Sequence, residues 1–364
     1  MAQPDLDTEI DPLAPAVAQQ LVGHEGAEQA LLDAFNSKRL AHAWLISGPR
    51  GIGKATLAYR FARFLFEHGV KPTDGLFGDG PAGLDVSSES SAFRLVAQGG
   101  HPGLRVIERA WDEKNKRLRS EIVVDDVRAL HGFFGMTSGD GGWRVAIIDS
   151  ADEMNRQAAN ALLKILEEPP KRAILLLLAH APGRLLPTIR SRCRHLALRP
   201  LEPQNLDRVL DGIHIEVPDE DRAVILGLAA GSPGRALALL EGGGAGLYRQ
   251  IIDLLASLPR LDAVGLHRLG DAVTGKKAAD AFRLLGELLD GTLQRLITYK
   301  ATGKAGNLSN ETALFAKLAP MASLDQWVEV WENAARLFPR AAGLNLDPKQ
   351  TTITVFSRIQ AATA

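Results

Sequence analysis

A glycine-rich segment that joins an apolar run to a helical pattern is the feature that most restricts what this chain can fold into. Positions 43–47 form a short, mainly apolar run, and glycines follow at positions 48, 51 and 53. From position 57 onwards, apolar residues recur at spacings of three and four, as they do on the buried face of a helix. Strand, glycine loop and helix in this order are typical of parallel α/β sheets. We therefore predict an α/β domain around this segment.

The same segment fits a phosphate-binding pattern. Gly48 to Ala55 matches the P-loop GxxxxGK[ST] except at its last position, where Ala55 replaces the hydroxyl residue that binds Mg²⁺. In such a loop, backbone N–H groups, the helix N-terminus and the lysine bind phosphate oxygens. The predicted nucleotide-binding residues are Gly48, Gly51, Gly53, Lys54, Ala55 and Thr56, which is one place out of register. We expect weak or vestigial ATP binding without a productive Mg²⁺ site; the alternative is an ordinary glycine-rich turn.

A second apolar run, at positions 145–148, ends at Asp149. Ligands of open α/β sheets collect at the carboxyl ends of the strands, so we interpret Asp149 as the Walker B carboxylate of the nucleotide site. Motor ATPases place a glutamate next, to orient the attacking water, but Ser150 stands here and is too short and too weakly basic for that role. Asp152 and Glu153 are expected to be solvated carboxylates at a helix start.

A change of pattern near position 200 divides the chain. Before it, apolar runs at 145–148 and 174–178 flank a helical segment, which predicts a parallel sheet covered by helices. After it, helical spacing dominates, and the glycines at 242–244 form a predicted hinge. The expected division is an N-terminal extension at 1–20, an α/β P-loop domain at 21–200, a small helical domain at 201–242 and an all-α domain at 243–364.

Two apolar stripes at helical spacing predict a helical bundle in the C-terminal third, and Ser323 with Gln326 resembles a capping box at the start of the second stripe. We interpret both stripes as bundle core rather than a ligand site. Their members are Phe282, Leu285, Leu289, Leu293 and Leu296 in the first stripe, and Leu324, Trp327, Val328, Trp331 and Phe338 in the second.

Composition excludes several classes of protein. The 364 residues exceed what one hydrophobic core supports, and a formal net charge of −1 gives no global field toward nucleic acid or anionic membranes. The single cysteine, Cys193, excludes an internal disulfide and a multi-cysteine zinc site, and it indicates a reducing compartment, so cytoplasm is expected. Residues 1–20 lack the pattern of a signal peptide, and the longest apolar run, 173–179, is too short to span a bilayer.

Two segments resemble the hallmark segments of bacterial clamp-loader subunits of the AAA+ family. They are Asn160 to Pro170, which reads NALLKILEEPP, and Thr188 to Cys193, which reads TIRSRC. His101-Pro102, Ile122 to Arg128 and Gly231 to Ala236 follow the order of the delta-prime branch of that family. The resemblance covers most of residues 20–240 and continues more faintly to 344–350. It implies an AAA+ nucleotide-binding domain, a helical lid domain and a C-terminal helical collar that packs with the collars of other subunits.

The resemblance also implies roles for two arginines. Arg192 is implied to be an arginine finger that acts in trans on the ATP site of an adjacent subunit, and Arg235 to be the sensor-2 arginine that touches the γ-phosphate. Without the family, Arg192 is interpreted as a surface or salt-bridged residue and Arg235 as a helix-surface charge. Ala179, near the sensor-1 position, offers no polar side chain. The four-cysteine module of many relatives is missing, so no zinc is expected, and Cys193 is expected to contribute packing.

The implied function is that of a largely non-hydrolysing subunit of the DNA polymerase III clamp loader. Such a subunit assembles with tau/gamma and delta subunits in a heteropentamer and acts through the complex on the sliding clamp and primer–template DNA. The alternatives are an ATP-hydrolysing motor subunit of the tau/gamma type and an unrelated P-loop kinase or signalling ATPase. A basic cluster, Lys114, Lys116, Arg117 and Arg119, is interpreted as a solvated turn rather than a DNA site.

Overall fold

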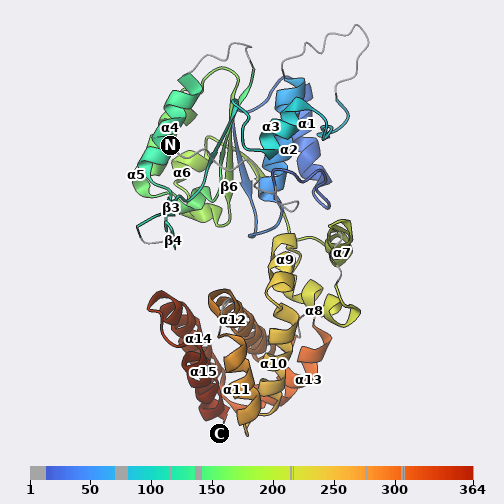
Figure 1. Cartoon of the computed structure of the whole chain (residues 1–364), viewed down its shortest axis with the longest axis vertical. Helices are drawn as coiled ribbons and strands as arrows, with labels where there is room; N and C mark the ends of the chain where they lie inside the picture. Colours follow the sequence, from blue (N-terminus) through green and yellow to red (C-terminus); the bar gives the residue numbers. More distant parts are fainter. Residues whose placement is uncertain are drawn as a thin grey trace. The chain divides into compact units, whose positions relative to one another are not determined.

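The computed structural model describes residues 14–69, 81–114, 117–135, 142–213, 215, 217–274, 278–304, 306 and 308–363. The chain divides into two compact units, Met1–His214 and Ile215–Ala364. The first unit contains a parallel sheet and the second is helical (Figure 1). Lys116 of the basic cluster and the side chain of Arg117 lie outside the described residues.

The first unit is built on a five-stranded parallel sheet with the strand order β2-β5-β6-β1-β7. Its strands are β1 (Ala43–Ser47), β2 (Leu104–Ile107), β5 (Arg144–Ile148), β6 (Ala173–Ala179) and β7 (Arg194–Ala197). The predicted apolar runs are therefore confirmed as β1, β5 and β6. Because strand side chains alternate in direction, Ala43 and Leu45 pack into one core while Trp44 and Ile46 pack into a second core.

Helices cover both faces of the sheet, which explains why its central strands are apolar along their whole length. On one side lie α1 (Glu25–Asn36), α2 (Lys54–His68) and α3 (Ser91–Ala97), and on the other lie α4 (Val124–Gly135) and α5 (Arg156–Glu167), as Figure 1 shows. The smaller elements of this unit are β3 (Trp111–Asp112), β4 (Arg117–Leu118), η1 (Ala151–Glu153), η2 (Pro182–Arg184), α6 (Pro187–Arg190) and α7 (Pro203–Gly212).

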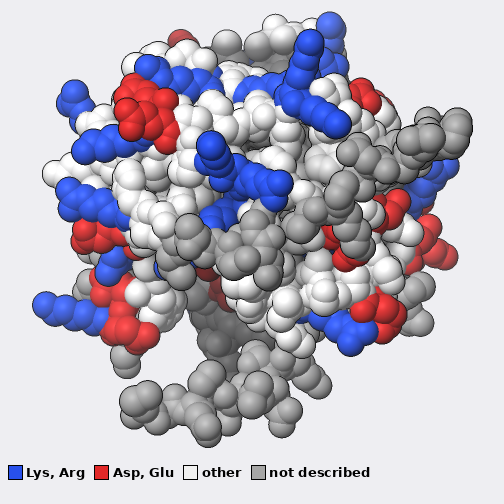
Figure 2. Space-filling view, turned by 90° about the horizontal axis from the view of Figure 1, so that it is seen from above, with Lys and Arg blue, Asp and Glu red and all other residues white. Residues whose placement is uncertain are grey.

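The surface of the chain carries both charge signs. Figure 2 shows basic and acidic groups interspersed with uncharged side chains over the viewed face. This distribution agrees with the formal net charge of −1. In the part of the chain that the structure describes, no helix is long and apolar enough to cross a bilayer.

The described residues of the second unit form helices without strands. These are α8 (Asp219–Ala229), α9 (Pro233–Glu241), α10 (Gly244–Ala256), α11 (Ala263–Ala272), α12 (Ala278–Thr302), α13 (Ser309–Leu318), η3 (Ala319–Met321), α14 (Leu324–Gly343) and α15 (Pro348–Thr363). The apolar stripe of α12 is buried, and the capping box of Ser323 and Gln326 at the start of α14 is confirmed. Leu324 differs from the expectation because it is exposed in the first turn of α14, whereas Trp327 and Phe338 are buried.

The predicted glycine hinge forms a tight turn between two packed helices. Gly243 adopts φ +63°, and α9 and α10 contact each other on either side of it. A Cβ atom on Gly244 would lie 2.6 Å from the side chain of Leu239, so the glycine is needed for this close approach. The structural division falls at 214/215, and the further separation into a lid and a collar stays a prediction.

Candidate functional site

The P-loop connects β1 to α2 at the carboxyl end of the sheet. Gly48 N donates to the carbonyl oxygen of Ala179 on the neighbouring strand β6, with a distance of 3.2 Å. Gly48 and Gly53 both have positive φ angles. A Cβ on Gly48 would lie 2.6 Å from the carbonyl oxygen of Leu198, so this loop conformation requires glycine there. The predicted strand–loop–helix arrangement is therefore confirmed.

Lys54 is buried in the first turn of α2, with 4% of its surface exposed. Its Nζ atom donates to the carbonyl oxygens of Gly48 at 2.8 Å and Pro49 at 2.6 Å, and it lies 2.8 Å from Nδ1 of His180. Burial lowers the pKa of Lys54 to about 8, although the Asp149 carboxylate opposes that shift. An ammonium group has three donors, and each donor of Lys54 has a protein acceptor.

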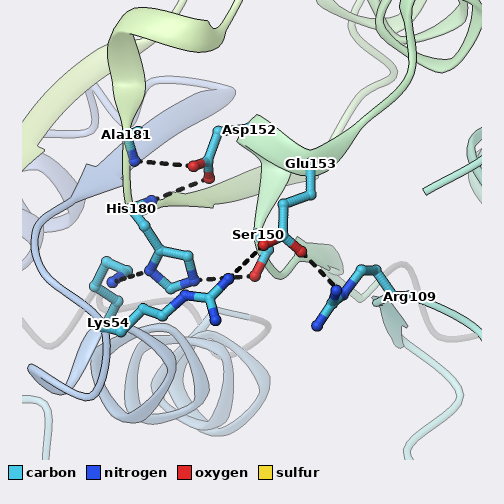
Figure 3. A network of polar contacts seen from close by, with 8 residues as sticks. Lys54, Arg109, Ser150, Asp152, Glu153, His180 and Ala181 are labelled. Atoms are coloured by element: carbon cyan, nitrogen blue, oxygen red, sulfur yellow. Dashed lines mark hydrogen bonds and ion pairs between the residues drawn. The ribbon is translucent and has the colours of Figure 1, made fainter. Parts of the chain in front are cut away.

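His180 follows the last residue of β6 and connects Lys54 to Ser150 (Figure 3). Because Lys54 offers only donors, Nδ1 of His180 accepts; Nε2 therefore carries the proton and donates to Oγ of Ser150 at 3.1 Å. Burial lowers the pKa of His180, and the nearby Lys54 cation lowers it further. The imidazole is thus held neutral, in the form that can accept from the lysine.

Asp152 and Glu153 are bound within the site, so the expectation of two solvated carboxylates was wrong. Asp152 accepts from the backbone N–H groups of His180 at 3.0 Å and Ala181 at 2.9 Å. Burial acts to raise the pKa of Asp152, but these backbone hydrogen bonds outweigh it and the pKa is lowered. Glu153 forms ion pairs with Arg50 at 2.5 Å and Arg109 at 2.9 Å. Asp152 thus binds the backbone after β6, and Glu153 binds Arg50 of the P-loop and Arg109 (Figure 3).

The other predicted nucleotide residues lie around the loop. Asp149 directly follows β5 and lies close enough to Lys54 for their charges to interact. Ala55 packs against the core and has no oxygen in its side chain, while Thr56 lies half-buried on α2. The chain therefore brings together Lys54 and Asp149 but supplies no hydroxyl at position 55 for Mg²⁺. The residues present do not fit Mg·ATP in its usual position.

Arg192 lies at the surface just after α6. Its Nη1 atom donates to the carbonyl oxygen of Thr188 at 3.1 Å, and its Nη2 atom forms an ion pair with Glu167 at 2.9 Å. The side chain is 38% exposed. Its action on another subunit stays a prediction. Arg235 lies on α9 of the second unit, and its sensor-2 role likewise stays a prediction.

Cys193 packs against the hydrophobic core between α5 and the sheet, which supports its predicted packing role. Burial raises the pKa of its thiol to about 12, so the thiolate is strongly disfavoured. Among the described residues, no group of three or more His, Cys, Asp or Glu side chains could hold a metal ion.

His180, Arg50 and Arg109 are the site residues that sequence reasoning missed. The sequence shows a histidine directly after an apolar strand, and that position is the available signal for His180. No local pattern marks Arg109, which reaches Glu153 from the segment after β2.

The sheet order, the glycine loop after β1 and Asp149 directly after β5 define a P-loop protein of the AAA+ class. A family model described as "DNA polymerase III, delta subunit" matches residues 23–202. The chain is 38% identical over 235 residues to the DNA polymerase III subunit delta' of Pseudomonas aeruginosa, covering 64% of this chain and 66% of that protein. The chain belongs to the delta-prime family of DNA polymerase III clamp-loader subunits.

Two further proteins are similar to the chain. The DNA polymerase III subunit gamma/tau of Mycobacterium bovis is 31% identical over 278 residues, which cover 75% of this chain and 45% of that protein. The matches therefore span less than two thirds of the length of the delta' protein and of the gamma/tau protein. A solved gamma subunit-related protein from Thermotoga maritima has a TM-score of 0.44 and 18% identity, covering 92% of this chain and 100% of that chain.

Proposed function

We propose that this chain is a largely non-hydrolysing subunit of the bacterial clamp loader that assists ATP hydrolysis by a neighbour. The observation that carries the proposal is the state of Lys54, whose three donors are bound by the P-loop and His180. Ala55 supplies no metal ligand and Ser150 supplies no general base. We therefore expect this chain to assist ATP hydrolysis through residues outside its own P-loop.

Arg192 is the residue proposed to act on the neighbour's ATP. Its side chain is partly exposed, and its guanidinium is held near the end of α6 by Thr188 and Glu167. A guanidinium that reaches a transferred phosphoryl group neutralises the charge of the transition state, and in trans it accelerates hydrolysis by about 10³- to 10⁵-fold. The reacting ATP and its Mg²⁺ then belong to the neighbouring subunit.

The proposed partners are the tau/gamma and delta subunits in a heteropentamer, with the sliding clamp and primer–template DNA engaged through that complex in the cytoplasm. The helices within residues 243–364 form the proposed collar, because their apolar faces are of the kind that pack into a bundle. Membership of the delta-prime family and the similarity to a gamma/tau subunit support this assembly.

A second candidate is an ATP-hydrolysing motor of the tau/gamma type. The 31% identity to the mycobacterial gamma/tau subunit favours it. Ser150, the missing hydroxyl at position 55 and the His180 contact to Lys54 oppose it. Hydrolysis by the isolated chain distinguishes the two candidates.

The test reconstitutes the clamp loader with the intact chain, with Arg192→Ala, or with Arg184→Ala as a matched control. Arg184 is exposed on η2 of the same unit. We expect Arg192→Ala to lower clamp- and DNA-stimulated hydrolysis at the receiving site by about 10³-fold, and Arg184→Ala to leave it unchanged. Hydrolysis by the isolated chain that disappears with Lys54→Ala would show a motor and overturn the proposal.

A further inference from the structure

We infer that His180 closes the P-loop of this chain to nucleotide by occupying the lysine that would otherwise bind phosphate. The imidazole lies 2.8 Å from Nζ of Lys54 and contributes the third acceptor to its ammonium group. A nucleotide phosphate therefore meets a lysine without a free donor. Sequence motifs alone account for poor hydrolysis, whereas this contact accounts for poor binding.

The histidine is fixed on both sides of its ring. Nε2 donates to Oγ of Ser150 at 3.1 Å, and Asp152 binds the backbone N–H groups of His180 and Ala181. A phosphate that displaced the imidazole from Lys54 would have to rotate a side chain whose backbone is held by two charge-assisted hydrogen bonds. Hydrogen bonds to a charged group are stronger than those between neutral groups. This support makes His180 a competitive partner for Lys54.

The charges around the contact keep it in one protonation state. Burial and the positive charges of Lys54 and Arg50 lower the pKa of His180. The carboxylates of Asp152 and Asp149 act in the opposite direction, but the neutral ring is favoured. Glu153 is engaged by Arg50 and Arg109. The neutral ring keeps its lone pair on Nδ1, so the contact with Lys54 persists at neutral pH.

Removing the imidazole should restore binding without restoring hydrolysis. The glycine loop and the start of α2 already have the shape of a phosphate-binding loop, and Lys54 would regain a donor. Ala55 still lacks a metal ligand and Ser150 still lacks a base. The restored binding should therefore depend little on Mg²⁺, and the bound ATP should remain intact.

The experiment titrates the full-length isolated chain with a fluorescent ADP, with and without Mg²⁺, and uses inorganic pyrophosphate as competitor. We expect His180→Ala to bind at least about tenfold more tightly than the unaltered chain, because one charge-assisted hydrogen bond to Lys54 becomes available. Ser150→Ala is the matched control: it removes the second partner of the ring but leaves the Lys54 contact, so its gain should be smaller. His180→Ala with Lys54→Ala should lose the gain.

Three results would overturn the inference: tight binding by the unaltered chain, no gain in folded His180→Ala, or a gain that survives Lys54→Ala. Thermal unfolding monitors the fold, and His180→Thr, whose short side chain does not reach Lys54, replaces His180→Ala if that variant does not fold. The inference deepens the proposed function but is measured without other subunits. If the inference about His180 fails, the Arg192 experiment in the assembled complex still tests the proposed function independently.

Discussion

The guanidinium of Arg192 lies 2.9 Å from a carboxylate oxygen of Glu167, near the end of α5. This ion pair joins the two segments that resemble the clamp-loader hallmarks, and it holds the proposed finger against its own subunit. Both side chains are partly exposed, at 38% and 52%, and exposed pairs contribute only about 0.2–1 kcal/mol. The pair can therefore be exchanged for a stronger contact with phosphate.

We predict that Glu167→Gln raises the stimulated ATPase rate of the assembled complex by up to about fivefold, because a carboxylate that competes for Arg192 is neutralised. Glu168→Gln is the matched control, since this exposed neighbour forms no ion pair with Arg192 in the structure. Steady-state hydrolysis by the two complexes gives the comparison. A lower rate in Glu167→Gln would mean that the carboxylate positions the finger instead.

Glu153→Gln should destabilise the first unit by about 1–3 kcal/mol, because it leaves two guanidinium groups without their carboxylate. The side chain of Glu153 is only 13% exposed between Arg50 and Arg109. Asp125→Asn serves as the control, since Asp125 and Arg128 form a 3.5 Å pair that is largely exposed. Urea unfolding measures both changes, and equal midpoints for the two variants would contradict the prediction.

Asp152→Asn should cost stability in a pH-dependent way. The pKa of Asp152 is lowered in the fold, so its stabilising contribution is complete above the unfolded pKa of 3.8 and is lost as the pH falls through the lower folded value. We expect a difference of about 1–2 kcal/mol from the unaltered chain at pH 7, which narrows below pH 3.8. Urea unfolding across this range provides the measurement; a constant difference would show that the charge is not responsible.

Glu311→Ala should be the most damaging of these substitutions. Glu311 is fully buried in the second unit, where it pairs with Arg295 at 2.7 Å and accepts from the hydroxyl of Tyr248 at 2.8 Å. Its removal leaves a partly buried cation without a partner, at a cost of about 3–5 kcal/mol. Tyr248→Phe removes one hydrogen bond and should cost about 1 kcal/mol. Urea denaturation followed by the circular dichroism of the helices gives the free energy of unfolding of both variants. A larger loss in Tyr248→Phe than in Glu311→Ala would contradict the prediction.

Cys193 should react slowly with thiol reagents while the chain is folded. With its pKa raised to about 12 by burial, the thiolate fraction at pH 8 is about 10⁻⁴. We expect Ellman's reagent to modify the native chain far more slowly than the urea-unfolded chain. Rapid modification of the native chain would show that the packing around Cys193 opens readily.

Local patterns were sufficient for much of the first unit. The apolar runs that became β1, β5 and β6, the glycine loop and the helix after it were all predicted, because periodicity and glycine placement act over a few residues. The capping box at Ser323 is another local signal that the structure confirms. The exposed Leu324 was missed because an apolar stripe indicates a buried face without showing where the partner helix ends.

The polar network at the strand ends was not predictable in the same way. Lys54 and His180 are 126 positions apart and meet because β1 and β6 are neighbours, with Ser47 opposite Ala179. Asp152 and Glu153 were interpreted as solvated because their sequence neighbours suggest a helix start. Their actual partners lie in the P-loop and in the segments that follow β6 and β2.

The sequence by itself determined the central strands β1, β5 and β6, the place of the phosphate-binding loop and the absence of a hydroxyl at position 55, because these depend on residue type and short-range spacing. Only the tertiary structure decided that Lys54 is bound by His180. That contact depends on strand order and register, which are set by packing between distant segments. If a residue that cannot accept a hydrogen bond stood at position 180, the same loop sequence would leave Lys54 with a free donor for phosphate.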